Sequence, residues 1–461
     1  MSLLPVSLGD VKGSGPREGA LFCLRFVTKR YILLAVTLFA LGTLLFRIRW
    51  PGRKLPPLYP QWHHRDLALP QHRWHATDHS REPKFFFVPG HTRGSGWGNV
   101  FQEILLNAHL AYKMDRAAVF YNYTWSEDGD YSDYNGKPIP SRIPLSALIR
   151  GPIVGDAFPA DKPSPPAIAE DYWNHACAGR IRSIERTPVH ATFKSWYMHD
   201  VTDGWVDHMK GVDDQCVEVM RSTGNIFDWV MFGDRHALHG LWAADLPSSP
   251  ILTHFGWSAL VELAFDANRA VFSPAPPGEL PLSAVPFTNN KDRYTELPGL
   301  LVLHIRRGDY EGHCAHLARW SSTFLAFNGL PGLAEFTAPP GGPEPGTATE
   351  EGMAVYLDRC YPSVARIVEH AERARADELA AGRPALERVF KALLKTGHFA
   401  GVSSSRDLEL GPEQRYVGQA VDMLVGQRAQ VFIGNGWSSL TGGTVIMRMA
   451  NGFRTATTRF F

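Results

Sequence analysis

The chain has 461 residues, of which 44% are hydrophobic and 20% are charged, and its formal net charge is +1. This length is enough for two domains of ordinary size, and the composition is that of a globular protein, which excludes a wholly disordered chain. Because the charges nearly balance, nothing requires a polyanionic partner, and we expect no binding of nucleic acid.

The sequence contains five cysteines. Cys23 lies beside an apolar segment described below, which leaves Cys177, Cys216, Cys314 and Cys360. In an oxidising compartment, these four could form two disulfides in any of three pairings. No Cys-x-x-Cys motif occurs, so a zinc site or a thioredoxin-type motif has no support.

Residues 31–46 form an uncharged apolar run that is flanked by basic residues on both sides. The run is slightly shorter than an average membrane span of about 20 residues, but short spans suit the thinner membranes of the early secretory pathway. The alternatives are a cleaved signal peptide and a buried core helix. A signal peptide is disfavoured because the run starts late and no small-residue cleavage site follows it closely. We predict a transmembrane anchor over residues 31–49.

We expect residues 1–30 to be a cytoplasmic tail, because the large folded part of the chain lies C-terminal to the anchor. The protein would then be a single-pass type II protein of the Golgi or endoplasmic reticulum membrane, with its body in the lumen. Asn122 begins an Asn-Tyr-Thr sequon, which predicts N-glycosylation and fits a luminal body.

Residues 50–83 are rich in Pro, His and Arg and show no steady period, which is typical of a stem. A short apolar run at 84–88 then predicts a buried strand. A glycine-rich loop follows it, residues 100–114 show the spacing of an amphipathic helix, and 116–123 predict the next strand. This order of strand, glycine loop, helix and strand is typical of parallel α/β sheets.

The region from 124 to 290 is harder to interpret, but 213–222 and 258–270 are predicted to be helical. Residues 299–305 are a strong buried strand, which we expect to open a second half of the body. Further on, the patterns predict helices over 353–381, 414–424 and 439–449, with a possible break of the first at Pro362, a strand over 430–434 and a strand or helix over 388–394.

The body is therefore predicted to consist of two α/β domains, residues 84–295 and 296–461. In such sheets, ligands bind beyond the C-terminal ends of the strands. Three segments of the sequence lie at such ends.

The first segment is the loop from Arg93 to Asn99, in which Gly94, Gly96 and Gly98 alternate with other residues. Glycines permit positive φ and close approach of the backbone to a ligand, and the start of the following helix offers free N–H groups to an anion. The spacing differs from the dinucleotide-binding fingerprint. The alternative is a tight turn between strand and helix.

The second segment carries His304 and Arg306 on one face of a strand and Arg307 on the other. A guanidinium is always charged and directs two donors toward a phosphate, so it could stabilise a diphosphate leaving group. The alternative is structural pairing of arginine with Asp309, a role that we expect for Arg307. Residues 307–309 also spell the Arg-Gly-Asp adhesion tripeptide, which we discount because it directly follows a buried strand.

The third segment is a strand over 430–434 that ends in a loop of small residues before a helix begins at Ser438 and Ser439. Ser438 is a candidate N-cap, and hydroxyl and N–H groups at such a position can bind phosphate. The alternative is helix capping alone.

Together these segments resemble the GDP-fucose protein O-fucosyltransferase superfamily, whose members carry a Gly-x-x-Asn loop, a His-x-Arg motif and a late Ser-rich turn in this order. The resemblance spans roughly residues 85–461 and rests on three short blocks. It implies a GT-B fold of two Rossmann-type domains that face a cleft, with residues 84–295 on the acceptor side and 296–461 on the nucleotide-sugar side. It also implies inverting, metal-independent transfer of fucose from GDP-fucose to a hydroxyl of a protein or glycan acceptor. No cofactor is implied. The matching blocks are Gly96 to Asn99, His304 to Arg306, and Ser438 with Ser439.

The resemblance also implies roles for single residues. Arg306 matches the arginine that neutralises the β-phosphate, and His304 and Asn99 match positions that contact the donor. The implied donor-binding set is Gly96, Gly98, Asn99, His304, Arg306, Asp422, Ser438 and Ser439, with Asp422 expected near the guanine base.

The sequence departs from the family pattern in two places. Residues 391–397 lack the Thr-Asp-like pair that usually ends the strand between the two C-terminal blocks. The usual catalytic base is not evident either. Ser95 stands near its place, and Glu103 is the nearest carboxylate, which makes Glu103 the candidate base.

Two alternative functions stay open. Asp128 and Asp130 could hold a divalent metal against a diphosphate in a GT-A glycosyltransferase, although their segment is also typical of a polar turn. The chain could instead be a membrane-tethered GDP-sugar-binding protein that lacks catalysis, because no base is evident.

Overall fold

The structure is a computed structural model that describes residues 31–42, 55–76, 83–91, 94–227, 231, 236–308, 310–340, 348–390 and 399–461. The chain divides into two compact units, residues 1–55 and 56–461. All statements about the architecture of the body refer to the second unit.

In the first unit, residues 31–42 are helical and all of their side chains are exposed. The exposed side chains include Leu33, at 71% of its full area, and Phe39, at 75%. Across the described ranges, no helix is both long and apolar enough to cross a membrane. Residues 43–49, the rest of the predicted anchor, lie outside the described ranges.

The first half of the body is built on a sheet of five parallel strands in the order β8-β2-β1-β10-β9. The central strand β1 consists of three buried phenylalanines, which explains the apolar run in the sequence. The strand bounds are Phe85–Phe87 (β1), Ala117–Phe120 (β2), Ile168–Ala169 (β8), Ile181–Ile184 (β9) and Cys216–Val219 (β10).

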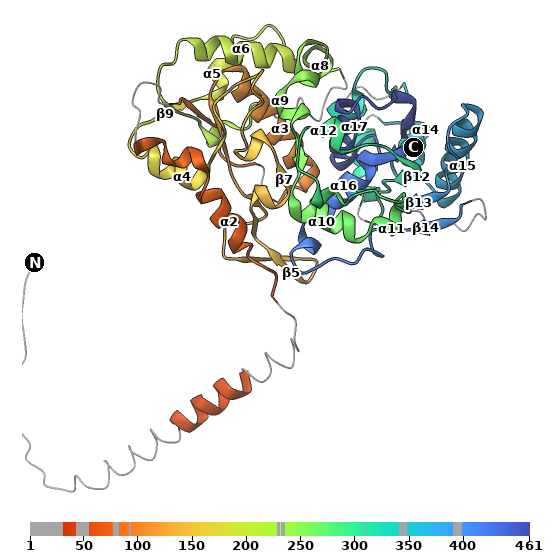
Figure 1. Ribbon diagram of the computed structural model, residues 1–461, viewed down its shortest axis with the longest axis horizontal. Helices are drawn as coiled ribbons and strands as arrows, with labels where there is room; N and C mark the ends of the chain where they lie inside the picture. Colours follow the sequence, from red (N-terminus) through yellow and green to blue (C-terminus); the bar gives the residue numbers. More distant parts are fainter. Residues whose placement is uncertain are drawn as a thin grey trace, which may run out of the picture. The chain divides into compact units, whose positions relative to one another are not determined.

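The second half is built on another sheet of five parallel strands, in the order β14-β13-β12-β15-β16. Figure 1 shows the strands β12 to β14 of this sheet among helices α15, α16 and α17. The strand bounds are Leu297–Leu303 (β12), Arg388–Phe390 (β13), Gly401–Ser403 (β14), Ala429–Gly434 (β15) and Thr458–Phe460 (β16). The prediction of an α/β fold with parallel sheets is confirmed, while the boundary at residue 295 stays a prediction.

Helices and short antiparallel pairs complete the body. The paired short strands are β3 (Tyr123–Thr124) with β6 (Arg142–Ile143), β4 (Tyr131–Tyr134) with β5 (Lys137–Pro140), and β7 (Ile149–Arg150) with β11 (Gly256–Trp257). The helices are α2 (Pro60–Leu67), α3 (Trp97–Lys113), α4 (Glu170–Ala176), α5 (Arg186–His190), α6 (Met198–Lys210), α8 (His239–Ala244), α9 (Pro250–Thr253), α10 (Ala259–Ala267), α11 (Arg269–Phe272), α12 (Asn290–Arg293), α13 (Tyr310–Arg319), α14 (Glu350–Cys360), α15 (Val364–Ala380), α16 (Gly418–Arg428) and α17 (Ser439–Ala450).

Most predicted elements are present, including the break between α14 and α15 beside Pro362. The prediction of a helix over 213–222 is wrong, because this segment contains β10, which pairs with β1 on one side and β9 on the other. Partners distant in the sequence thus decide its conformation, and local propensity does not. The family-pattern departure at 391–397 lies outside the described residues.

Residues 56–76 of the predicted stem are an integral part of the body. Tyr59 is fully buried and donates its hydroxyl to the carbonyl of Glu413 at 2.8 Å. Gln71 donates to the carbonyls of Gly155 and Ala167 at 3.0 and 2.6 Å. These contacts attach the start of the body to both halves, because Glu413 belongs to the second half and Gly155 and Ala167 belong to the first.

The two predicted disulfides are present, and the pairing that the sequence left open is Cys177–Cys216 and Cys314–Cys360. The first joins the C-terminal end of α4 to β10, and the second joins α13 to α14. Each bridge therefore ties a helix to another element within its own half of the body.

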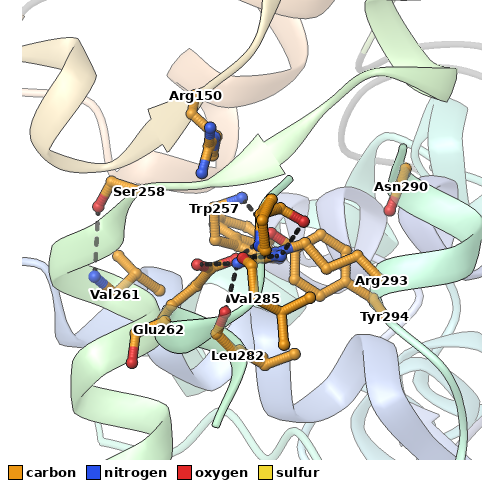
Figure 2. Close-up of polar contacts among 12 residues, drawn as sticks. Arg150, Trp257, Ser258, Val261, Glu262, Leu282, Val285, Asn290, Arg293 and Tyr294 are labelled. Atoms are coloured by element: carbon orange, nitrogen blue, oxygen red, sulfur yellow. Dashed lines mark hydrogen bonds and ion pairs between the residues drawn. The ribbon is translucent and has the colours of Figure 1, made fainter. Parts of the chain in front are cut away.

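A buried ion pair secures the segment that connects the two sheets. Figure 2 shows Arg293 of α12 facing Glu262 of α10, with the two side chains joined by two hydrogen bonds of 2.6 and 2.7 Å. The guanidinium also donates to the carbonyls of Leu282, Val285 and Pro286. Because the side chains are only 3% and 1% exposed, every donor needs such a partner.

Tyr294 extends this network to the rest of the body. Its hydroxyl donates to Glu262 at 2.8 Å and accepts from the backbone N–H of Trp257 at 2.7 Å. Burial and the Glu262 carboxylate raise the pKa of this hydroxyl well above its ordinary value. The Trp257 indole in turn donates to Gln427 of α16 at 2.8 Å.

We predict that Arg293→Ala lowers the free energy of unfolding by about 3–5 kcal/mol, because it leaves the Glu262 carboxylate buried without its cation. Denaturant unfolding measures this change. The control is Arg366→Ala, which breaks a 2.8 Å pair with Glu369 that is partly exposed, and it should cost less than about 1 kcal/mol. Equal effects of the two substitutions would contradict the importance of the buried pair.

Candidate functional site

A single large cavity collects most of the residues that the sequence analysis selected. Its volume is about 1250 Å³. Lining residues come from the start of α3, the segment after β12 with α13, the start of α17, the β3–β6 region and residues 415–419. The predicted site residues among them are Gly96, Gly98, Asn99, Arg306, Ser438 and Ser439.

The glycine loop leads from β1 into α3, which begins at Trp97 with Gly96 as its N-cap residue. Among the described residues, no side chain caps the start of this helix. The N–H of Asn99 donates to the carbonyl of Gly96, and the N–H groups before it remain available at the cavity wall. Asn99 is half-buried, and its side chain lines the cavity without a hydrogen bond to any described residue.

The α17 helix begins at Ser439 with Ser438 as its N-cap residue. The predicted N-cap position of Ser438 is confirmed, but its side chain makes no capping hydrogen bond. The hydroxyl is therefore not used by its own helix and lines the cavity together with that of Ser439. Two uncapped helix N-termini thus reach one cavity, and both favour an anion there.

Glycines let α3 and α17 approach each other closely. A Cβ atom on Gly98 would lie 2.4 Å from the backbone nitrogen of Leu440, and one on Gly442 would lie 2.9 Å from a side-chain oxygen of Gln102. Gln102 also donates to the carbonyls of Gly98 and Ser439, at 3.2 and 3.4 Å. Gly98 was expected to let a ligand approach the backbone. The absence of a side chain at Gly98 also leaves room for the backbone of Leu440 in the second half.

Arg306 follows β12 and lines the cavity. Its guanidinium stacks on the ring of Tyr310 at 4.5 Å and makes no ion pair or hydrogen bond with the residues that the structure describes. A permanent positive charge is therefore held in place and left unneutralised within this part of the chain.

Arg307 points to a different partner, as expected for a structural residue. It donates to the carbonyl of Pro362 at 2.7 Å and stacks on the ring of Tyr361 at 4.3 Å. Both contacts lie in the connection between α14 and α15. Asp309, the expected partner and the last residue of the adhesion tripeptide, lies outside the described residues.

His304 lies behind the cavity wall. It is 7% exposed, and its Nδ1 is 2.6 Å from the hydroxyl of Thr441 in the first turn of α17. Its backbone N–H donates to Ile433 of β15. The predicted contact between His304 and the donor stays a prediction, and the observed contacts hold the end of β12 against α17.

Two other predicted residues do not line the cavity. Glu103 is 4% exposed and lies near Tyr121, whose pKa is raised by burial and then by this carboxylate. Asp422 is half-buried on α16, one turn after Gln419, which does line the cavity. Their proposed catalytic and guanine-binding roles stay predictions.

Asp128 and Asp130 are exposed in the turn between β3 and β4, where the backbone N–H of Asp128 donates to the hydroxyl of Ser126. The described residues contain no cluster of His, Cys, Asp or Glu side chains suited to a metal ion. Asn122 is half-buried between β2 and β3, and its glycosylation stays a prediction.

The sequence analysis missed the aromatic lining of the cavity. Four of these rings lie along α13 and the residue after it, at Tyr310, His313, His316 and Trp320, and others come from both halves. Burial and the neighbouring Tyr134 raise the pKa of Tyr123, whose hydroxyl donates to the carbonyl of Ser95 at 3.1 Å. The spacing of three and four residues along α13 was the one available signal. The remaining aromatic lining residues are Trp97, Trp125, Tyr134, Tyr416 and Trp437.

No protein-family model and no curated protein sequence matches the chain. The chain is similar to crystal structures of POFUT1, a GDP-fucose protein O-fucosyltransferase, each at 14% sequence identity. The match to the GDP-fucose complex covers 82% of this chain and 98% of POFUT1 with a TM-score of 0.39. The GDP complex and the ligand-free form match over 84% of this chain and 99% of POFUT1, with TM-scores of 0.40 and 0.38.

We predict that Gly98→Ala separates the starts of α3 and α17, because the added methyl group would overlap backbone atoms that cannot move alone. The free energy of unfolding should fall by about 1–3 kcal/mol or more, as measured by denaturant unfolding. The matched control is Gly96→Ala in the same loop, where a Cβ atom meets nothing within 4 Å. If both variants were equally stable, the close contact between α3 and α17 would be refuted.

Proposed function

We propose that the protein is an inverting glycosyltransferase that transfers fucose from GDP-fucose to a hydroxyl of an acceptor. The observation that carries this proposal is the convergence of Arg306, Asn99, the two serines and two uncapped helix N-termini on one cavity. These groups come from both halves of the body. Such an arrangement suits a ligand with a diphosphate at its centre.

The chemistry follows from the charge that develops as the diphosphate leaves. The oxygen of the acceptor hydroxyl forms a bond to the anomeric carbon on the face opposite the nucleotide, and the bond from that carbon to the β-phosphate oxygen breaks. GDP departs with the electron pair, the hydroxyl proton is released, and the anomeric configuration inverts. Arg306 and the N-termini of α3 and α17 stabilise the growing negative charge more in the transition state than in the ground state.

The identity of the donor rests on the motifs. Any nucleotide diphosphate sugar would suit an arginine beside two helix N-termini. The order of Gly96-x-x-Asn99, His304-x-Arg306 and Ser438-Ser439 along the chain supports GDP-fucose, because it resembles that of the O-fucosyltransferases. His304 would act by positioning, since it fixes the strand that carries Arg306 against α17.

A second candidate function is binding of a GDP-sugar without turnover. The observation that favours it is the absence of any Asp or Glu among the described residues that line the cavity. Among those residues, the imidazole side chains are those of His313 and His316. Binding of GDP-fucose without any release of GDP would support this alternative.

We also propose that the protein is a type II membrane protein of the Golgi or endoplasmic reticulum. The exposed apolar side chains of residues 31–42 and the two disulfides of the body support this location. In sealed microsomes, the body should resist added protease until detergent is present, and Asn122→Gln should remove one glycan. Digestion of the body without detergent would contradict the luminal orientation.

We predict that Arg306→Ala slows the release of GDP from GDP-fucose by about 10²–10³-fold, because it removes charge that stabilises the leaving group. Arg306→Lys should recover only part of the rate, since an ammonium cannot donate two parallel hydrogen bonds. Turnover is measured by coupled detection of GDP. Nearly normal turnover of Arg306→Ala would contradict the proposal that Arg306 stabilises the leaving group.

The matched control is the neighbouring Arg307→Ala. It removes the contacts with Tyr361 and the Pro362 carbonyl, so it should lower the free energy of unfolding by about 1 kcal/mol. The affinity for donor should change little. A larger loss of donor binding in Arg307→Ala than in Arg306→Ala would mean that the roles of the two arginines are reversed.

A further inference from the structure

The cavity has more room than a nucleotide sugar requires. Pockets that hold one drug-sized ligand measure about 300–1,000 Å³, whereas this cavity measures about 1250 Å³. Among the described lining residues, Arg306 and Arg415 carry the permanent charges. The rest of the wall is neutral and rich in rings, which suits an uncharged second substrate.

One side of this neutral region is a row of rings along α13. The centroids of Tyr310 and His313 are 4.9 Å apart, those of His313 and His316 are 6.4 Å apart, and those of His316 and Trp320 are 6.0 Å apart. A helix rises about 1.5 Å per residue, so Trp320 lies about 15 Å along the axis from Tyr310. The row therefore starts beside Arg306 and extends along α13 to Trp320.

The other side of the neutral region comes from the first half of the body. Trp125 follows β3, and Tyr134 ends β4. Their rings meet edge to face with centroids 5.3 Å apart, and both line the cavity. Trp320 is 57% exposed and Tyr134 is 50% exposed, so both rings have faces that a substrate can cover.

The α13 wall is rigid before any substrate binds. The Cys314–Cys360 disulfide joins α13 to α14. After Trp320, the carbonyl of Ser322 accepts hydrogen bonds from the Tyr356 hydroxyl at 2.8 Å and from the Trp437 indole at 3.1 Å. A wall that is already ordered loses little side-chain and loop entropy on binding, which raises affinity.

We propose that the acceptor is an oligosaccharide that lies between the α13 ring row and the Trp125–Tyr134 pair. This proposal rests on the proposed function and narrows its acceptor class. A pyranose ring presents apolar C–H faces that pack on aromatic rings, and its hydroxyls lie at the ring edge. The imidazoles of His313 and His316 and the hydroxyls of Ser321 and Ser322 lie among the rings and suit those hydroxyls.

The test is calorimetric titration of the full chain in detergent, saturated with GDP. The probes are cellotetraose, tetra-N-acetylchitotetraose and mannotetraose, together with a 15-residue peptide of Gly, Ala, Ser and Thr. At least one oligosaccharide should bind, and the peptide should not. Trp320→Ala should weaken oligosaccharide binding by about tenfold or more, while its affinity for GDP should stay within about twofold of wild type.

The control is Trp196→Ala, which removes another exposed tryptophan that does not line the cavity, and it should change neither affinity. Binding of the peptide but not the sugars, binding of no probe, or sugar binding that Trp320→Ala leaves intact would overturn the proposal. Failure of the proposed function would look different, because wild-type protein would then either not bind GDP at all or bind GDP-fucose without releasing GDP.

Discussion

The close contact between α3 and α17 is the constraint on which the site depends. Each helix starts at the C-terminal end of a parallel strand, β1 in the first sheet and β15 in the second. The two starts can share one cavity because Gly98 has no side chain where the backbone of Leu440 passes. Since no side chain among the described residues caps either helix, the positive dipole ends of both helices are directed at the same cavity. Because residue 98 is a glycine, the starts of α3 and α17 can therefore lie at the same cavity.

The body around this contact is arranged to keep it in place. His304 bonds to Thr441 and holds the end of β12 against the first turn of α17, which positions Arg306 in the cavity. The buried pair of Arg293 and Glu262 fixes the connection between the two sheets. Arg306 and the side chains of Asn99 and Ser438 line the cavity without hydrogen bonds to described residues. Polar and charged groups that converge on one cavity in this way form a candidate site for a ligand.

The sequence predicted the elements that have strong local signals and missed those decided by distant partners. The apolar run of β1, the helix that follows it and the strand before Arg306 have clear periodicity, so most of the anion-binding wall could be found. The strand β10 was taken for a helix because four residues after a polar stretch have little periodicity, and its conformation depends on pairing with β1 and β9. The role of Gly98 against Leu440, and the cavity that α13 lines together with the Trp125–Tyr134 pair, arise from tertiary packing. No local pattern in the sequence reports them.

The most direct test of the account is the binding of GDP-fucose, GDP-mannose and UDP-galactose to the protein by calorimetry, with and without EDTA. The account predicts that GDP-fucose binds most tightly and that EDTA changes nothing, because Arg306 and two helix N-termini provide the positive charge that a metal would otherwise supply. Tightest binding of UDP-galactose, or binding that EDTA abolishes, would contradict it. Such a result would favour a metal-dependent diphosphate site, such as one at Asp128 and Asp130, over a site at Arg306.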